Sequence, residues 1–82
     1  MEEYERRLRW HCRRGLLELD ITLERFLDRE LSRLTPADRD VLEQLLMIDD
    51  IQLWAWVSGR EVCEDPQQAE MIRCIMSSTQ AA

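Results

Sequence analysis

The stretch LLELDITLERFLDRELSRL, residues 16–34, decides the fold of this chain. Apolar side chains recur in it at intervals of three and four residues, and Glu, Asp and Arg occupy most of the positions between them. A stripe of this period runs along one side of an α-helix and is buried against other elements. We therefore predict a long amphipathic helix from about Leu16 to Arg33, the spine of the fold. Its predicted buried side consists of Leu16, Leu19, Leu23, Phe26, Leu27 and Leu34, with Leu31 close to the stripe.

Caps and periodicity predict four further helices around this spine. Thr and Asp side chains cap the amides of a first turn, Pro fits the first helical position, and Gly ends a helix. The predicted segments are a helix from about Glu2 to Arg14, one that starts at Thr35-Pro36 and carries apolar residues to Ile48, one that Asp49-Asp50 caps and Gly59 ends, and one that starts at Asp65-Pro66.

The length and composition of the chain favour an all-α fold. Eighty-two residues make one domain at most, and two Gly, two Pro and one Phe leave little material for a small β-sandwich. We predict a compact single-domain bundle of five short antiparallel helices over residues 1–82. Its ordered core is expected over about residues 4–76, with a frayed C-terminus at residues 77–82.

The charge of the chain is acidic overall but uneven. The net charge is −6, yet residues 1–14 carry five Arg against three Glu. An acidic surface repels nucleic acid, so we expect no nucleic-acid partner. A basic patch on an acidic body instead favours a selective, oriented protein partner. The sequence has neither a membrane-length apolar run nor a signal or transit segment. These absences predict a protein of the bacterial cytoplasm rather than the mitochondrial matrix, with no membrane insertion.

No motif in the sequence predicts an enzyme. A glycine-rich phosphate loop, a GxSxG sequence and an HExxH sequence are all missing. Cys12, Cys63 and Cys74 form no CxxC pair, and with one histidine they do not make a zinc site, so we expect reduced thiols. His11 lies at the edge of an apolar stripe, which favours a packed or helix-terminal role, and Cys12 is expected to be a small buried hydrophobe. We predict no catalytic residue, no metal site and no cofactor-binding residue.

The outer side of the first predicted helix is a candidate binding surface. Trp10 projects nearly opposite the stripe of Leu8 and Cys12, and arginines lie three or four residues from it. Trp and Arg dominate the energetic centres of protein interfaces. The alternative is that Trp10 packs under a neighbouring helix, with arginine stems covering it. The arginines in question are Arg6, Arg7, Arg13 and Arg14.

A second candidate patch lies on the predicted helix after Asp49-Asp50. Trp54 and Trp56 are two residues apart, so they cannot both face one core. Because Leu53, Trp56 and Val57 form a coherent stripe, we expect Trp54 to be the more exposed.

The junction Arg13-Arg14-Gly15-Leu16-Leu17-Glu18 has a purely structural explanation beside a functional one. Arginines suit the C-terminus of a helix, and Gly15 permits the turn. Glu18 is spaced to cap the next helix from three residues after Gly15.

The same junction resembles the signature of the succinate dehydrogenase assembly factor family. The resemblance rests on Trp10-x-Cys12-Arg13-Arg14-Gly15-x-x-Glu18-Leu19-Asp20, which contains the RGxxE motif of that family. A second block, Leu45-Leu46, Asp49-Asp50, Leu53 and Trp56, is similar to the family's LLxxDDxxLxxW stretch. The resemblance covers nearly everything from about Tyr4 to Met76, although little chain follows the fifth helix.

The resemblance implies a monomeric helical bundle that binds the flavoprotein subunit of succinate dehydrogenase or fumarate reductase. It implies that the chain promotes covalent attachment of FAD to that subunit while holding no FAD stably itself. Arg14, Gly15 and Glu18 are then the expected partner-binding residues, with Arg13 and Trp10 beside them. The alternative function is an antitoxin-like or inhibitory adaptor that uses the same surface on a different protein.

Overall fold

The predicted spine is present and divides into two parts. In the computed structural model, which describes residues 3–80, helix α2 spans Leu17–Glu30 and a short 3-10 helix, η1, continues it over Leu31–Arg33. The stripe read from the sequence is the buried side of α2, since Leu19, Leu23, Phe26 and Leu27 are almost completely covered. Periodicity therefore located both the helix and the face that it buries.

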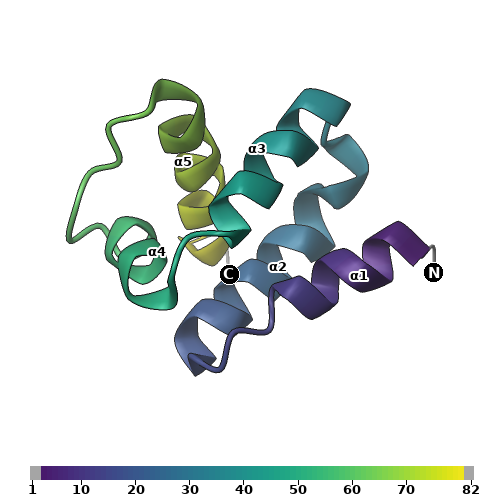
Figure 1. Cartoon of the computed structure of the whole chain (residues 1–82), viewed down its shortest axis with the longest axis horizontal. Helices are drawn as coiled ribbons and strands as arrows, with labels where there is room; N and C mark the ends of the chain where they lie inside the picture. Colours follow the sequence, from purple (N-terminus) through teal and green to yellow (C-terminus); the bar gives the residue numbers. More distant parts are fainter. Residues whose placement is uncertain (1–2, 81–82) are drawn as a thin grey trace.

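The prediction of an all-α fold is confirmed. Residues 3–80 form five α-helices and η1, with no strand among them, and they are arranged as in Figure 1. The radius of gyration is 11.7 Å, close to the value of about 12 Å expected for a compact chain of this length. No helix in this range is long and apolar enough to cross a membrane. Besides α2, the α-helices are α1 (Glu3–His11), α3 (Pro36–Leu46), α4 (Asp50–Val57) and α5 (Pro66–Gln80).

One apolar core joins these helices. Phe26 of α2 has no exposed surface, and neither do Leu45 of α3, Leu53 of α4 and Ile75 of α5. Helix α5 packs against α2, α3 and α4, and α1 adds the buried side chain of Leu8. Figure 1 shows α1 on the side of the molecule away from the loop between α4 and α5. One side of α1 is therefore left outside the core.

The predicted caps of the later helices are confirmed by hydrogen bonds. Thr35 accepts the amide of Asp38, and the Asp38 carboxylate accepts the amide of Thr35, which makes a reciprocal capping box. Asp49 accepts the amide of Gln52 at the start of α4. Asp65 accepts the amides of residues 67 and 68 at the start of α5.

Two boundaries differ from the prediction. Helix α1 ends at His11 rather than Arg14, because the chain turns through residues 12–16 into α2. Helix α5 extends beyond Met76 to Gln80, where a frayed end was expected from residue 77. Ser78 is buried in this extension, and its hydroxyl donates to the carbonyl of Cys74, so the added turn packs on the protein. Residues 81–82 lie outside the described range.

Candidate docking surface around the α1–α2 loop

The loop between α1 and α2 is held by its own backbone amides. Gly15 has a φ of +86°, in the left-handed region that glycine enters without a steric penalty. The carboxylate of Asp20 accepts the amide of Arg14 at 2.7 Å and the amide of Gly15 at 3.2 Å. The turn predicted from Gly15 is therefore confirmed. The predicted capping role of Glu18 is wrong, because Asp20, on the first turn of α2, accepts the loop amides instead.

The side chain of Arg14 ties this loop to the end of α3. Its guanidinium donates to the carbonyl of Leu46 at 2.7 Å and to that of Ile48, and it pairs with Asp50 at 2.5 Å. The Arg14 side chain is 12% exposed. The planar guanidinium can serve both carbonyls and the carboxylate at once, an arrangement that the single ammonium of lysine does not reproduce. The Arg14 guanidinium thus donates to carbonyls at helix C-termini, as the sequence predicted. Its main contact is with the end of α3, and a longer contact of 3.5 Å reaches the carbonyl of His11 at the end of α1.

This geometry corrects the position expected for Arg14. The helical spacing placed it on the same surface as Trp10, but α1 ends before Arg14 and the periodicity no longer applies there. The structure also brings the two sequence motifs together, since Arg14 belongs to RGxxE and Asp50 to the block around Asp49-Asp50.

Gly15 and Glu18 face outward from this anchored loop. A Cβ atom built on Gly15 would meet no atom within 4 Å. Glu18 is exposed on the first turn of α2, and its carboxylate has no hydrogen-bond or ion-pair partner within residues 3–80. A partner can therefore approach the backbone at Gly15 and bind the carboxylate of Glu18 without first breaking a contact inside the chain.

Trp10 is exposed on α1, as one of the two sequence interpretations predicted. Its side chain is 70% exposed, so the alternative in which it packs under a neighbouring helix is wrong. Arg6, Arg7 and Arg13 are also exposed, and none of them forms an ion pair with any residue between 3 and 80. Arg9 behaves differently, because it pairs with Glu5 at 3.1 Å and with Asp28 at 2.8 Å.

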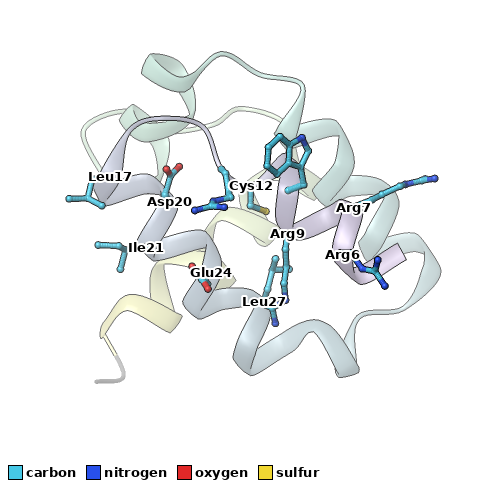
Figure 2. A pocket seen from close by; sticks show the side chains of 11 residues that line it. Arg6, Arg7, Arg9, Cys12, Leu17, Asp20, Ile21, Glu24 and Leu27 are labelled. Atoms are coloured by element: carbon cyan, nitrogen blue, oxygen red, sulfur yellow. The ribbon is translucent and has the colours of Figure 1, made fainter. Parts of the chain in front are cut away.

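A groove with a volume of 730 Å³ runs between α1 and α2, with Trp10, Arg13 and Leu17 among its lining residues. Figure 2 shows Leu17 and Ile21 together at one end of it, with Arg6 and Arg7 at the other. Leu17 is 70% exposed and Ile21 41% exposed. Neither residue belongs to the site predicted from the sequence. Their signal is the four-residue spacing of two apolar side chains outside the buried stripe of α2.

The thiol beneath this groove is not a nucleophile. Cys12 is buried, and removal from water raises the pKa of its thiol to about 12, against the smaller opposing effects of Arg14 and Arg9. A thiol with such a pKa stays protonated at neutral pH and does not attack. His11 is exposed at the end of α1. Within residues 3–80, no three His, Cys, Asp or Glu side chains are grouped as metal ligands.

The second candidate patch is not formed. Trp54 and Trp56 are both partly buried, and both pack against the core, so Trp54 does not stand out as an exposed interaction residue. Helix α4 is covered on several sides, because Leu53, Ala55 and Val57 are also buried. A helix that is buried on several sides does not follow the single-face pattern from which Trp54 was expected to be more exposed than Trp56.

The fold and this surface belong to a small all-α protein with an exposed surface around the α1–α2 loop, and comparisons with known proteins identify its family. Residues 6–79 match the family model described as "flavinator of succinate dehydrogenase". The chain belongs to this family, as its two motifs indicated.

Curated relatives of the chain carry the name FAD assembly factor SdhE. The protein of Idiomarina loihiensis is 47% identical over 73 residues, which cover 89% of this chain and 81% of the relative. That of Shewanella oneidensis is 44% identical over 80% of each chain, and that of Colwellia psychrerythraea is 43% identical over 85% of this chain and 77% of the relative. These names describe assembly factors rather than enzymes, which supports the prediction that this chain is not an enzyme. No solved structure matches the chain.

The contact between Arg14 and Asp50 predicts a measurable coupling in stability. Arg14→Ala removes a partly buried cation that holds two carbonyls and a carboxylate, and we expect it to lower the free energy of unfolding by about 2–3 kcal/mol. Asp50→Ala and the double variant complete a cycle, with an expected coupling of about 0.5–3 kcal/mol. Urea denaturation followed by circular dichroism measures all four proteins. Purely additive effects would show that the ion pair does not hold the loop.

The burial of the thiols predicts the order in which they react. Cys74 is exposed, whereas Cys12 and Cys63 are buried. With iodoacetamide at pH 8, we expect Cys74 to be alkylated first and Cys12 to be protected in the native protein. Peptide mass spectrometry identifies the modified residues, and unfolding in urea should make all three reactive. Rapid alkylation of native Cys12 would contradict the burial and the raised pKa of its thiol.

Proposed function

We propose that this chain binds the flavoprotein subunit of succinate dehydrogenase or fumarate reductase and promotes the covalent attachment of FAD to that subunit. The observation that carries the proposal is the division of the RGxxE motif. Arg14 is engaged inside the protein, while Gly15 and Glu18 are displayed beside it with nothing in front of them. The family and the names of the relatives supply the partner class and the reaction.

The proposed contacts follow from the chemistry of each residue. Glu18 offers a carboxylate for a charge-assisted hydrogen bond, and Gly15 lets the partner's backbone approach closely. Trp10 and Arg13 lie beside them as interface residues of the type that contributes most to binding. Arg14 acts as a positioning residue, because its hydrogen bonds determine where the loop lies relative to α3 and α4.

A binding protein without a reactive group can still accelerate bond formation. Holding two reacting groups in the correct orientation can lower a barrier by up to about 7–11 kcal/mol. We propose that the chain binds a conformer of the partner in which the flavin and its attachment residue are held together, and so raises the population of that conformer. In this proposal the chain works as a monomer in the cytoplasm, binds no nucleic acid and holds no FAD of its own.

The first test is flavinylation in cells without their own assembly factor. The chain is co-expressed with a succinate dehydrogenase flavoprotein subunit, and covalent flavin is read as in-gel fluorescence after denaturation. We expect the fluorescence to depend on the wild-type chain and to fall at least tenfold with Glu18→Ala. Because Glu18 has no partner in the described chain, this variant should change the free energy of unfolding by no more than about 0.5 kcal/mol.

The control for Glu18→Ala is Glu64→Ala, which removes an equal charge from an exposed position in the α4–α5 loop. It should retain full activity. Equal fluorescence with and without the wild-type chain would rule out flavinylation for this partner. The inhibitory adaptor would then be tested by binding to proteins other than flavoproteins.

Gly15 provides a second test, which separates obstruction of the partner from strain in the loop. Both Gly15→Asn and Gly15→Arg place a side chain at a φ of +86°, at an expected cost of about 1–2 kcal/mol in folding, less for Asn, which tolerates this region. We expect Asn to retain most flavinylation and the larger Arg to abolish it. Thermal melts followed by circular dichroism monitor folding. If Gly15→Arg unfolds the protein, the loss of function reflects strain rather than obstruction.

A further inference from the structure

The groove between α1 and α2 carries features that the RGxxE contacts do not use. Its two ends differ in chemistry, because Leu17 and Ile21 lie at one end and Arg6 and Arg7 at the other (Figure 2). Trp10 and Arg13 also line it, and Trp10 is as exposed as Leu17. Exposed apolar side chains gathered around a groove and bordered by charge are typical of a protein-binding surface.

Three of the four arginines that line this groove form no ion pair with any residue between 3 and 80, in a chain that has an excess of acids. The sequence holds 17 Asp and Glu against 11 Arg, yet Arg6, Arg7 and Arg13 have no ion pair among the described residues. Arg9, on the same helix, shows that pairing is available there, since it binds both Glu5 and Asp28. The rim of the groove, formed by Arg6, Arg7 and Arg13, therefore presents three exposed cations that no acid of the described residues neutralises.

Two acidic residues that line the groove, Asp20 and Glu24, bear on how a bound segment is oriented. Asp20 is already occupied by the amides of Arg14 and Gly15. Glu24 lines the groove and forms no ion pair within the described chain. Figure 2 shows both acids between the apolar end and the Arg6–Arg7 end. A carboxylate of a bound segment is repelled near Glu24 and attracted by Arg6 and Arg7, which favours one orientation of that segment.

We infer that this groove docks an acidic, amphipathic segment of the flavoprotein partner, with apolar side chains against Trp10, Leu17 and Ile21 and carboxylates toward Arg6 and Arg7. This inference rests on the proposed function. Charge complementarity gives the segment its chemistry, and the exposed apolar end favours a polypeptide over a nucleic acid, whose backbone offers phosphates alone. The groove extends the surface around Gly15 and Glu18, because Leu17 precedes Glu18 on the first turn of α2.

The test is direct binding to the purified apo-flavoprotein subunit, measured by calorimetry at several salt concentrations. Arg6→Ala/Arg7→Ala should weaken binding about fivefold to tenfold and make the salt dependence shallower. The matched control is Arg33→Ala/Arg60→Ala, which removes two exposed charges that do not line the groove.

Trp10→Ala should weaken binding about 30-fold or more, and Ile21→Ser should weaken it without changing the salt dependence. Circular dichroism confirms that each variant is folded.

The outcomes separate this inference from the proposed function. If Arg6→Ala/Arg7→Ala binds within twofold of the control Arg33→Ala/Arg60→Ala while Glu18→Ala loses binding, the groove is not the docking site. The proposed function then stands. If the wild-type chain does not bind the flavoprotein, the proposed function and the partner assigned to the groove fail together. A short DNA duplex is the remaining probe. Tighter binding to the duplex than to the flavoprotein would contradict the docking of an acidic protein segment. It would indicate a phosphate ligand instead.

Discussion

The arrangement of this protein's surface depends on the hydrogen bonds of one guanidinium. Arg14 leaves the loop after α1 and binds the carbonyls of Leu46 and Ile48 and the carboxylate of Asp50. A cation with so little exposure is stable only when its donors are satisfied, so the loop and the α3–α4 turn are fixed relative to each other. Asp20 completes the arrangement from the other side by accepting two loop amides.

This constraint divides the RGxxE motif into one residue that is engaged inside the protein and two that are exposed. Arg14 is a structural residue that holds the loop, and its neighbours Gly15 and Glu18 remain open to a partner. The second motif then has a physical reason for accompanying the first, because Asp50 supplies the carboxylate that Arg14 binds. Binding surfaces carried on loops gain precision when the loop is anchored to rigid elements, since less conformational entropy is lost on association.

The surface next to the loop combines positive charge with an exposed aromatic side chain. The protein is acidic as a whole, yet the exposed side of α1 carries arginines around Trp10 that form no ion pair with any residue between 3 and 80. Such an arrangement orients an approaching partner by its charge before the apolar side chains come into contact. The thiol of Cys12, which lines the groove, is held protonated by burial. In the proposed function the contribution of the chain is geometric, and the curated relatives carry the name of an assembly factor.

The sequence by itself determined the helices, the caps at Thr35 and Asp49 and the buried stripe of α2, because these depend on periodicity and on bonds between near neighbours. The family resemblance names Gly15 and Glu18 as partner-binding residues, a role that stays a prediction, and the sequence left Trp10 open between an exposed and a packed position. Only the tertiary structure decided that Arg14 faces inward, that Asp20 rather than Glu18 holds the loop amides, and that Leu17 and Ile21 border a groove. Asp50 and Leu46, which the Arg14 guanidinium binds, are more than 30 residues away from it in the sequence, and no local pattern encodes such a contact. The partial burial of both Trp54 and Trp56 has a related cause, since the burial of α4 on several sides depends on the elements around it rather than on its own period.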